Sequence, residues 1–171
     1  MTQKNILSIL MENEAGALSR VIGLFSQRGF NIDSFTVAKT EDSTISRLTI
    51  TTHGDAKTLE QITKQCHKLI DVLTVKNITE QEHVERELML IKVLANDNER
   101  KDSVKRVADI FRAQIVDVNI DCYTVQLAGP PDRLNALIRA LADETTIIEM
   151  ARSGTVGMLR GKKALRGKSI K

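Results

Sequence analysis

Apolar residues recur with two different periods in the first part of the chain, and each period predicts one kind of element. Residues 6–10 are almost all apolar, as in a short buried strand. From Ala17 to Arg28 the apolar positions recur every three or four residues, which predicts an amphipathic helix. The apolar stripe of that helix consists of Leu18, Val21, Ile22 and Phe25. Gly29 follows, and glycine is the residue that most often ends a helix in the left-handed conformation.

The chain then continues with further strand and helix patterns. Residues 30–38, 45–53 and 72–75 alternate or are rich in β-branched side chains, so they are predicted strands. Asp55 is a candidate N-cap for a second helix. The apolar positions of that helix are Leu59, Ile62, Cys66 and Leu69. The order is therefore β-α-β-β-α-β, which is the split-βαβ or ferredoxin-like arrangement.

A polar stretch at residues 79–85 is the predicted linker, and the same kind of pattern restarts after it. The strands expected in this second part are 88–94, 115–120, 123–127 and 147–150, and the helices include 104–111 and 131–141. The two halves are faintly similar. Either an internal duplication or common core patterning accounts for that similarity.

We therefore expect an α+β fold made of two tandem ferredoxin-like domains. The boundaries that the pattern predicts are residues 1–78 for the first domain, 79–85 for the linker, 86–159 for the second domain and 160–171 for a basic tail.

Composition limits the class of protein. The chain has 171 residues, of which 42% are hydrophobic and only 3% aromatic, so Leu, Ile and Val must fill the cores. No apolar run is long enough for a membrane span, and the N-terminal apolar run is too short for a secretory signal. Cys66 and Cys122 lie far apart and outside any C-x-x-C pair. We expect reduced, structural thiols and a cytoplasmic protein without a membrane partner.

The net charge of +3 conceals an uneven distribution. The tail contains six basic residues and no acid, which leaves 19 basic against 22 acidic residues in the rest of the chain. These basic residues are Arg160, Lys162, Lys163, Arg166, Lys168 and Lys171. Two interpretations of the tail remain open: a solvated terminus, or an arm for an acidic partner surface or nucleic acid. Nothing else in the sequence indicates nucleic-acid binding.

Residues for catalysis or metal binding are not grouped in the sequence. His53, His67 and His83 are scattered, and no G-x-S-x-G motif is present. A phosphate-loop-like stretch at residues 157–162 has the wrong spacing, and residues 154–157 lack the third glycine of a dinucleotide fingerprint. RNA-binding proteins of this fold class need exposed aromatic residues on the central strands, and no such motif surrounds the strand aromatics here. We expect no catalytic residues, no metal and no cofactor in this chain.

One turn of the chain nevertheless has the composition of a small-molecule site. Residues 12–16 read Glu-Asn-Glu-Ala-Gly and lead directly into the first helix. The amides at a helix N-terminus attract a carboxylate, and Gly16 lets a ligand approach the backbone. Asn13 offers both a donor and an acceptor, and Asn31 lies beyond the other end of the helix. The residues alone leave a second interpretation open, in which Gly16 caps the helix and the asparagines satisfy turns.

The stretch from Ile6 to Ile32, ILSILMENEAGALSRVIGLFSQRGFNI, closely resembles the ACT domain of the small, regulatory subunits of acetohydroxyacid synthase (acetolactate synthase). Four later segments share the resemblance, which therefore extends over nearly the whole chain. These segments are residues 46–50 (SRLTI), 65–72 (QCHKLIDV), 84–92 (VERELMLIK) and 151–157 (ARSGTVG).

The resemblance implies a non-catalytic subunit that activates a large catalytic subunit and makes it sensitive to feedback inhibition by a branched-chain amino acid, usually valine. It implies that thiamine diphosphate, Mg²⁺ and FAD belong to the catalytic subunit and that the ACT domain forms a homodimer. The effector would lie between two ACT domains. By position, the residues that would hold it are Asn13, Ala15, Gly16, Ala17 and Leu18 of one chain with Asn31 and Ile32 of the neighbour. A free-standing amino-acid sensor with another partner is the alternative.

Overall fold

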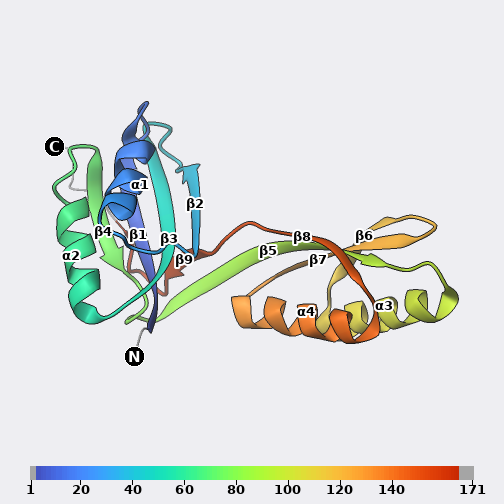
Figure 1. Cartoon of the computed structure of the whole chain (residues 1–171). Helices are drawn as coiled ribbons and strands as arrows, with labels where there is room; N and C mark the ends of the chain where they lie inside the picture. Colours follow the sequence, from blue (N-terminus) through green and yellow to red (C-terminus); the bar gives the residue numbers. More distant parts are fainter. Residues whose placement is uncertain (1–2, 166–171) are drawn as a thin grey trace. The chain divides into compact units, whose positions relative to one another are not determined.

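The chain folds into two compact units. The computed structural model describes residues 3–165 (Figure 1). Of the described residues, the first unit contains 3–84 and 155–165, and the second runs from Glu85 to Gly154. Part of the basic tail, including Arg166, Lys168 and Lys171, lies outside the described residues.

The first unit is a four-stranded antiparallel sheet with two helices. Its elements are β1 (Gln3–Glu12), α1 (Ala17–Gln27), β2 (Ser34–Lys39), β3 (Ile45–Gly54), α2 (Ala56–Cys66) and β4 (Val72–Asn77). The strand order is β2-β3-β1-β4, so that β1 and β3 are central and β2 is an edge strand. β1 and β3 pair over their full length, from Gln3 opposite Gly54 to Glu12 opposite Ile45.

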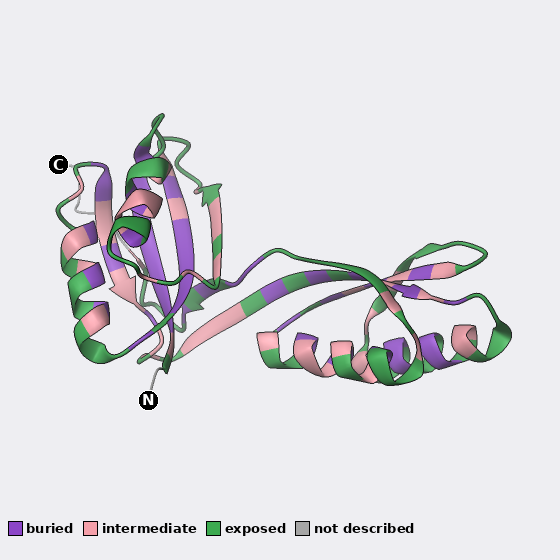
Figure 2. Ribbon diagram, viewed as in Figure 1, coloured by how far each residue is buried: buried purple, intermediate pink, exposed green. Residues whose placement is uncertain are grey.

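Both helices cover the same face of this sheet, because their apolar stripes share one core with alternate residues of the central strands. Val21 and Phe25 of α1 and Ile62 of α2 are buried against that face of β1 and β3. Figure 2 shows the buried residues concentrated along these two strands. The core consists of Leu7, Ile9, Met11, Ala17, Val21, Phe25, Leu48, Ile50, Leu59, Ile62, Cys66, Val72 and Val75. Burial raises the pKa of the Cys66 thiol to about 11.

The second unit repeats the arrangement. Its elements are β5 (His83–Leu94), α3 (Asn98–Phe111), β6 (Gln114–Val118), β7 (Cys122–Gly129), α4 (Pro131–Glu144) and β8 (Ile147–Arg152). The order β6-β7-β5-β8 is the order of the first sheet, strand for strand. Asp97 caps α3 through a hydrogen bond from the amide of Arg100, and Pro131 begins α4 at a position that tolerates proline. The expected fold of two tandem ferredoxin-like domains is confirmed.

Two elements differ from the sequence pattern. The second strand begins at Ser34 rather than at residue 30, because Phe30 and Ile32 lie in a loop where they pack against the core. A short strand, β9 (Val156–Leu159), was not expected. It belongs to the first unit, whereas the pattern placed these residues at the end of the second domain.

β9 lies in a short segment, residues 155–159, that we call the C-terminal strap. The carbonyl of Gly157 accepts a hydrogen bond from Nη2 of Arg47 at 2.6 Å, and the same nitrogen donates to Oγ of Ser8 at 3.0 Å. Leu159 is buried in a small cluster with Ile6 and Ile78. Half-burial lowers the pKa of Arg47, although its guanidinium stays charged. The strap is thus attached to the first unit by both polar and apolar contacts.

Replacing Gly157 by alanine is expected to destabilise the first unit by about 1–3 kcal/mol, because a Cβ there would lie 2.6 Å from Cδ1 of Ile78. Gly23→Ala is the matched control, since a Cβ at that position in α1 meets nothing within 4 Å. It should stabilise the helix by about 0.5–1 kcal/mol. Urea unfolding of both variants measures the two effects, and effects of the same sign would contradict the packing of the strap.

Candidate functional site

The first helix begins at a glycine that carries no cap. Gly16 has φ 86° and ψ −15°, in the left-handed region that glycine adopts without strain. No side chain accepts a hydrogen bond from the first turn of α1, and that turn contains no acidic residue. The first amides of a helix have no partner within the helix, and they form its positive end. The start of α1 therefore has unused capacity for a negatively charged group.

Asn13 lies beside this helix start and is held in place by its neighbours. Its side-chain nitrogen donates to the carbonyl of Ser43 at 3.0 Å, and its side-chain oxygen accepts from Oγ of Ser46 at 3.1 Å. Its backbone amide donates to the carbonyl of Thr44 at 2.7 Å. An asparagine side chain has two N–H donors and two lone pairs, so one of each is left over. The exposed amide is thus fixed in orientation and still has hydrogen-bonding capacity.

The other residues expected at this turn contribute their backbone only. Ala17 is buried and Leu18 packs against the core, so the side chains of both point away from the turn. Ala15 is exposed, and the amide of Ala17 donates to the carbonyl of Glu14 at 3.2 Å. Asn13, Ala15, Gly16 and the starting amides of α1 therefore lie together, in one turn between β1 and α1.

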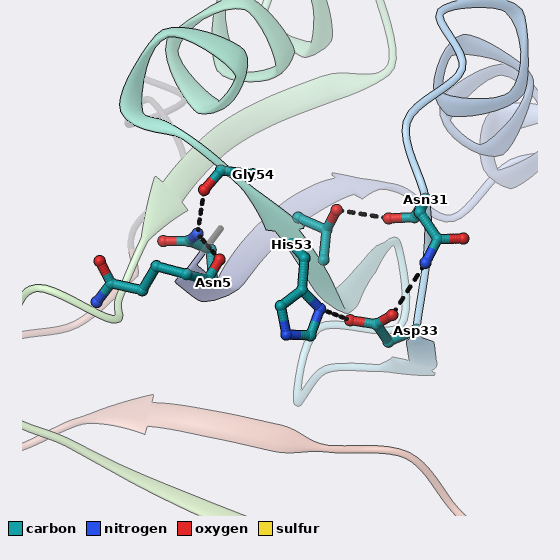
Figure 3. Close-up of polar contacts among 7 residues, drawn as sticks. Asn5, Asn31, Asp33, His53 and Gly54 are labelled. Atoms are coloured by element: carbon teal, nitrogen blue, oxygen red, sulfur yellow. Dashed lines mark hydrogen bonds and ion pairs between the residues drawn. The ribbon is translucent and has the colours of Figure 1, made fainter. Parts of the chain in front are cut away.

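Asn31 is held by a separate group of polar contacts. Its side-chain nitrogen donates to Oδ1 of Asp33 at 3.0 Å, and the other carboxylate oxygen of Asp33 pairs with Nδ1 of His53 (Figure 3). The carbonyl of Asn31 accepts a hydrogen bond from Oγ1 of Thr52. Ile32 faces the core beside it. These contacts tie the loop before β2 to the end of β3.

The structure does not bring Asn13 and Asn31 together within one chain. Asn13 is bonded to Ser46 near the start of β3, whereas Asn31 is bonded to Thr52 near its end. These two positions are six residues apart on one strand, which corresponds to about 20 Å. That distance is several times the length of a free amino acid. One molecule of such a ligand cannot contact both asparagines of the same chain.

Arg20, in the first turn of α1, lies beside this site, and the sequence pattern did not single it out. Its Nε donates to Oδ2 of Asp71 at 2.5 Å and its Nη2 donates to Oδ1 at 2.9 Å. This hydrogen bonding holds the pKa of Asp71 below its usual range and raises that of Arg20. The spacing of four residues from Gly16 was the available signal, because residues four apart share a helix face. Asp71 lies 51 residues further along the chain, and local pattern does not predict such a contact.

Metal-binding clusters and membrane-spanning helices were also sought in the part of the chain that the structure describes. Within residues 3–165 no group of three or more His, Cys, Asp or Glu side chains is arranged to hold a metal ion. No helix in this range is long and apolar enough to cross a membrane. The turn between β1 and α1 is therefore the candidate site that the described residues offer.

A ferredoxin-like domain whose first helix starts at an uncapped glycine beside a fixed asparagine has the features expected of an ACT domain. The comparisons with known proteins agree. The family "AHAS small subunit-like ACT domain" matches residues 7–74, and the family "Small subunit of acetolactate synthase" matches residues 86–161. The chain belongs to the family of acetolactate synthase small subunits.

Individual relatives support this assignment over almost the whole length. The acetolactate synthase small subunit of Haemophilus influenzae is 59% identical over 94% of this chain and 98% of its own length. The acetolactate synthase isozyme 3 small subunit of Escherichia coli is 58% identical over 95% of this chain and 99% of its own. The crystal structure of the small subunit from Thermotoga maritima has a TM-score of 0.83 and 36% identity, and covers 94% of this chain and 99% of that one.

Proposed function

We propose that this chain is the regulatory subunit of a cytoplasmic acetolactate synthase. It binds the large catalytic subunit, raises its activity and makes it sensitive to feedback inhibition by a branched-chain amino acid, with valine as the first candidate. Thiamine diphosphate, Mg²⁺ and FAD belong to the catalytic subunit, and this chain contributes none of the catalytic groups. Membership of the small-subunit family supports the choice of partner.

The observation that carries the effector part of the proposal is the turn between β1 and α1. A free amino acid presents a carboxylate and an ammonium group. The uncapped start of α1 suits the carboxylate, and the spare acceptor and donor of Asn13 suit either end. Gly16 adds no Cβ to this turn, where Nη1 of Arg20 already lies close to the backbone. The amide of Leu18 completes this half of the site, together with that of Ala17 if the ligand shares or replaces its hydrogen bond to the carbonyl of Glu14.

The other half of the site, with Asn31 and Ile32, is proposed to come from a second copy of the chain. β2 is an edge strand that runs from the Asn31 end of β3 to the end beside Asn13. If β2 paired antiparallel with β2 of a second copy, the start of one strand would lie beside the end of the other. Asn31 of one copy would then approach Asn13 of its neighbour. A homodimer through the ACT domain is thus the smallest unit that forms a complete site.

Inhibition requires that the effector bind one state of the complex more tightly than another, and couplings of about 1–3 kcal/mol are typical. We propose that the bound amino acid changes the packing of the two ACT domains and that the catalytic subunit responds to this change. Because the effector binds one packing of the two ACT domains more tightly, its binding favours that packing and so changes the activity of the catalytic subunit.

Reconstitution with the catalytic subunit tests this function. Acetolactate formation is measured with and without this chain, and with valine, leucine or isoleucine added. We expect activation by the chain, followed by inhibition by at least one of the three amino acids. If the chain bound an amino acid but neither activated nor bound any acetolactate synthase, it would instead be a sensor for another partner. If the isolated chain turned over pyruvate, the non-catalytic assignment would be wrong.

A further inference from the structure

The guanidinium of Arg20 is held in one orientation at the start of its own helix. Asp71 binds it through two parallel hydrogen bonds, from Nε at 2.5 Å and from Nη2 at 2.9 Å. The side chain of Asp71 is only 6% exposed, so this carboxylate is confined by the surrounding protein. Bidentate pairs of this kind fix the plane of the guanidinium as well as its position. Arg20 is therefore pre-organised before any ligand binds.

Nη1, the guanidinium nitrogen that does not bind Asp71, is the one nearest to Gly16. A Cβ built on Gly16 would lie 2.9 Å from Nη1 of Arg20, but 3.6 Å from Cζ and 3.8 Å from Nη2. Nη1 carries two N–H donors. Among residues 3–165 no acceptor is bonded to Nη1. The free edge of the guanidinium thus lies over the uncapped glycine.

Two sets of hydrogen-bond donors converge at this point. The first is the start of α1, where the amides lack a side-chain cap. The second is the Nη1 edge, which faces away from the Asp71 carboxylate. Glu14 is exposed nearby and makes a small contribution to the raised pKa of Arg20. A carboxylate placed beside Gly16 would receive a charge-assisted hydrogen bond from Nη1 in addition to those from the backbone.

We propose that Arg20 recognises the carboxylate of the effector and that Asp71 is the positioning residue that orients it. This inference rests on the proposed function, since it assigns two further residues to the same effector site. It also adds a second reason for glycine at position 16. Any side chain there would occupy the space in which Nη1 meets the ligand, in addition to being strained at φ 86°.

The test compares valine with valinamide, which has the same side chain and ammonium group but no carboxylate. Isothermal titration calorimetry on the full-length chain measures both affinities. The wild-type chain should bind valine at least about tenfold more tightly than valinamide, as expected for a charge-assisted hydrogen bond. In Arg20→Lys, which keeps a positive charge for Asp71 but lacks the second donor edge, that preference should fall by about tenfold.

Two further variants separate recognition from support of the fold. Asp71→Asn should also reduce the preference for valine, although Asp71 does not touch the ligand. Arg28→Lys, at an exposed position after the other end of α1, should leave the preference unchanged. Because each ratio is measured on one folded variant with two ligands, a general loss of stability cancels.

Two outcomes would be decisive. If Arg20→Lys left the preference for valine over valinamide unchanged, with or without an equal loss of both affinities, Arg20 would not recognise the carboxylate, and the inference would be overturned while the proposed function stood. If the wild-type chain bound no branched-chain amino acid at all, the effector part of the proposed function would itself fail.

Discussion

Gly16→Asp is expected to abolish inhibition by valine in the reconstituted complex while activation of the catalytic subunit remains detectable. The added carboxylate would project toward Nη1 of Arg20, where the ligand carboxylate is proposed to bind, and two like charges there repel. We expect the concentration of valine for half-inhibition to rise by on the order of 100-fold or more. Aspartate tolerates the left-handed conformation better than most residues, so the domain should still fold.

The matched control for this substitution is Gly161→Asp. Gly161 also has a positive φ of 69°, but nothing lies within 4 Å of a Cβ at that position. The control therefore carries the same charge and the same kind of backbone strain away from the effector site, and it should leave valine inhibition intact. Activation is measured in the same assay, because a misfolded chain would lose both properties. Full valine inhibition of the Gly16→Asp complex would show that the effector binds elsewhere.

Phe25→Ala is expected to lower the free energy of unfolding of the first unit by about 3–5 kcal/mol. Phe25 is completely buried in the core between α1 and the sheet, and its ring makes an edge contact with Phe30 at 6.1 Å between centroids. Removing it leaves a cavity under the helix that carries Gly16 and Arg20. Valine affinity should fall as well, because the position of α1 determines where the site residues lie.

The control for Phe25→Ala is Ile70→Ala, which removes an apolar side chain that is 89% exposed in the same unit. It should change the stability by no more than about 0.5 kcal/mol. Native-state hydrogen exchange can assign each effect to its unit. Protection in the β1 and β3 amides should drop in Phe25→Ala and persist in Ile70→Ala. Equal losses in the two variants would contradict the packing of α1.

Much of the fold could be predicted from the sequence, because local periodicity and burial agree in most elements. Leu18, Val21 and Phe25 of the predicted α1 stripe pack in the core, and so do Leu48 and Ile50 of β3. The Thr49 and Thr51 face of β3 is buried as well, although the alternation predicted it to be the polar face. β2 and β9 were harder for a physical reason. Phe30 and Ile32 are apolar because they pack from a loop, which a pattern does not distinguish from a strand. β9 has only four residues, and contacts with Arg47 and Ile78, distant in sequence, hold its segment in place.

The candidate site shows the same difference between features set by local sequence and features set by long-range contacts. Asn13 and Gly16 could be selected from the sequence because their chemistry is local: a turn, a helix start and a residue without Cβ. The hydrogen bonds that orient Asn13 could not, since Ser43 and Ser46 are about thirty residues away along the chain. The role proposed for Arg20 likewise depends on Asp71, which reaches it from the turn before β4.

The sequence by itself thus predicted most of the elements, the tandem arrangement and a candidate turn for a small-molecule site, because each depends on neighbours within a few residues. Only the tertiary structure decided which donors remain free at that turn, and that Asn13 and Asn31 lie at opposite ends of β3. The order in which strands pair determines such distances, and pairing joins residues that are far apart in the chain. For that reason the complete effector site is proposed to require two copies of this protein.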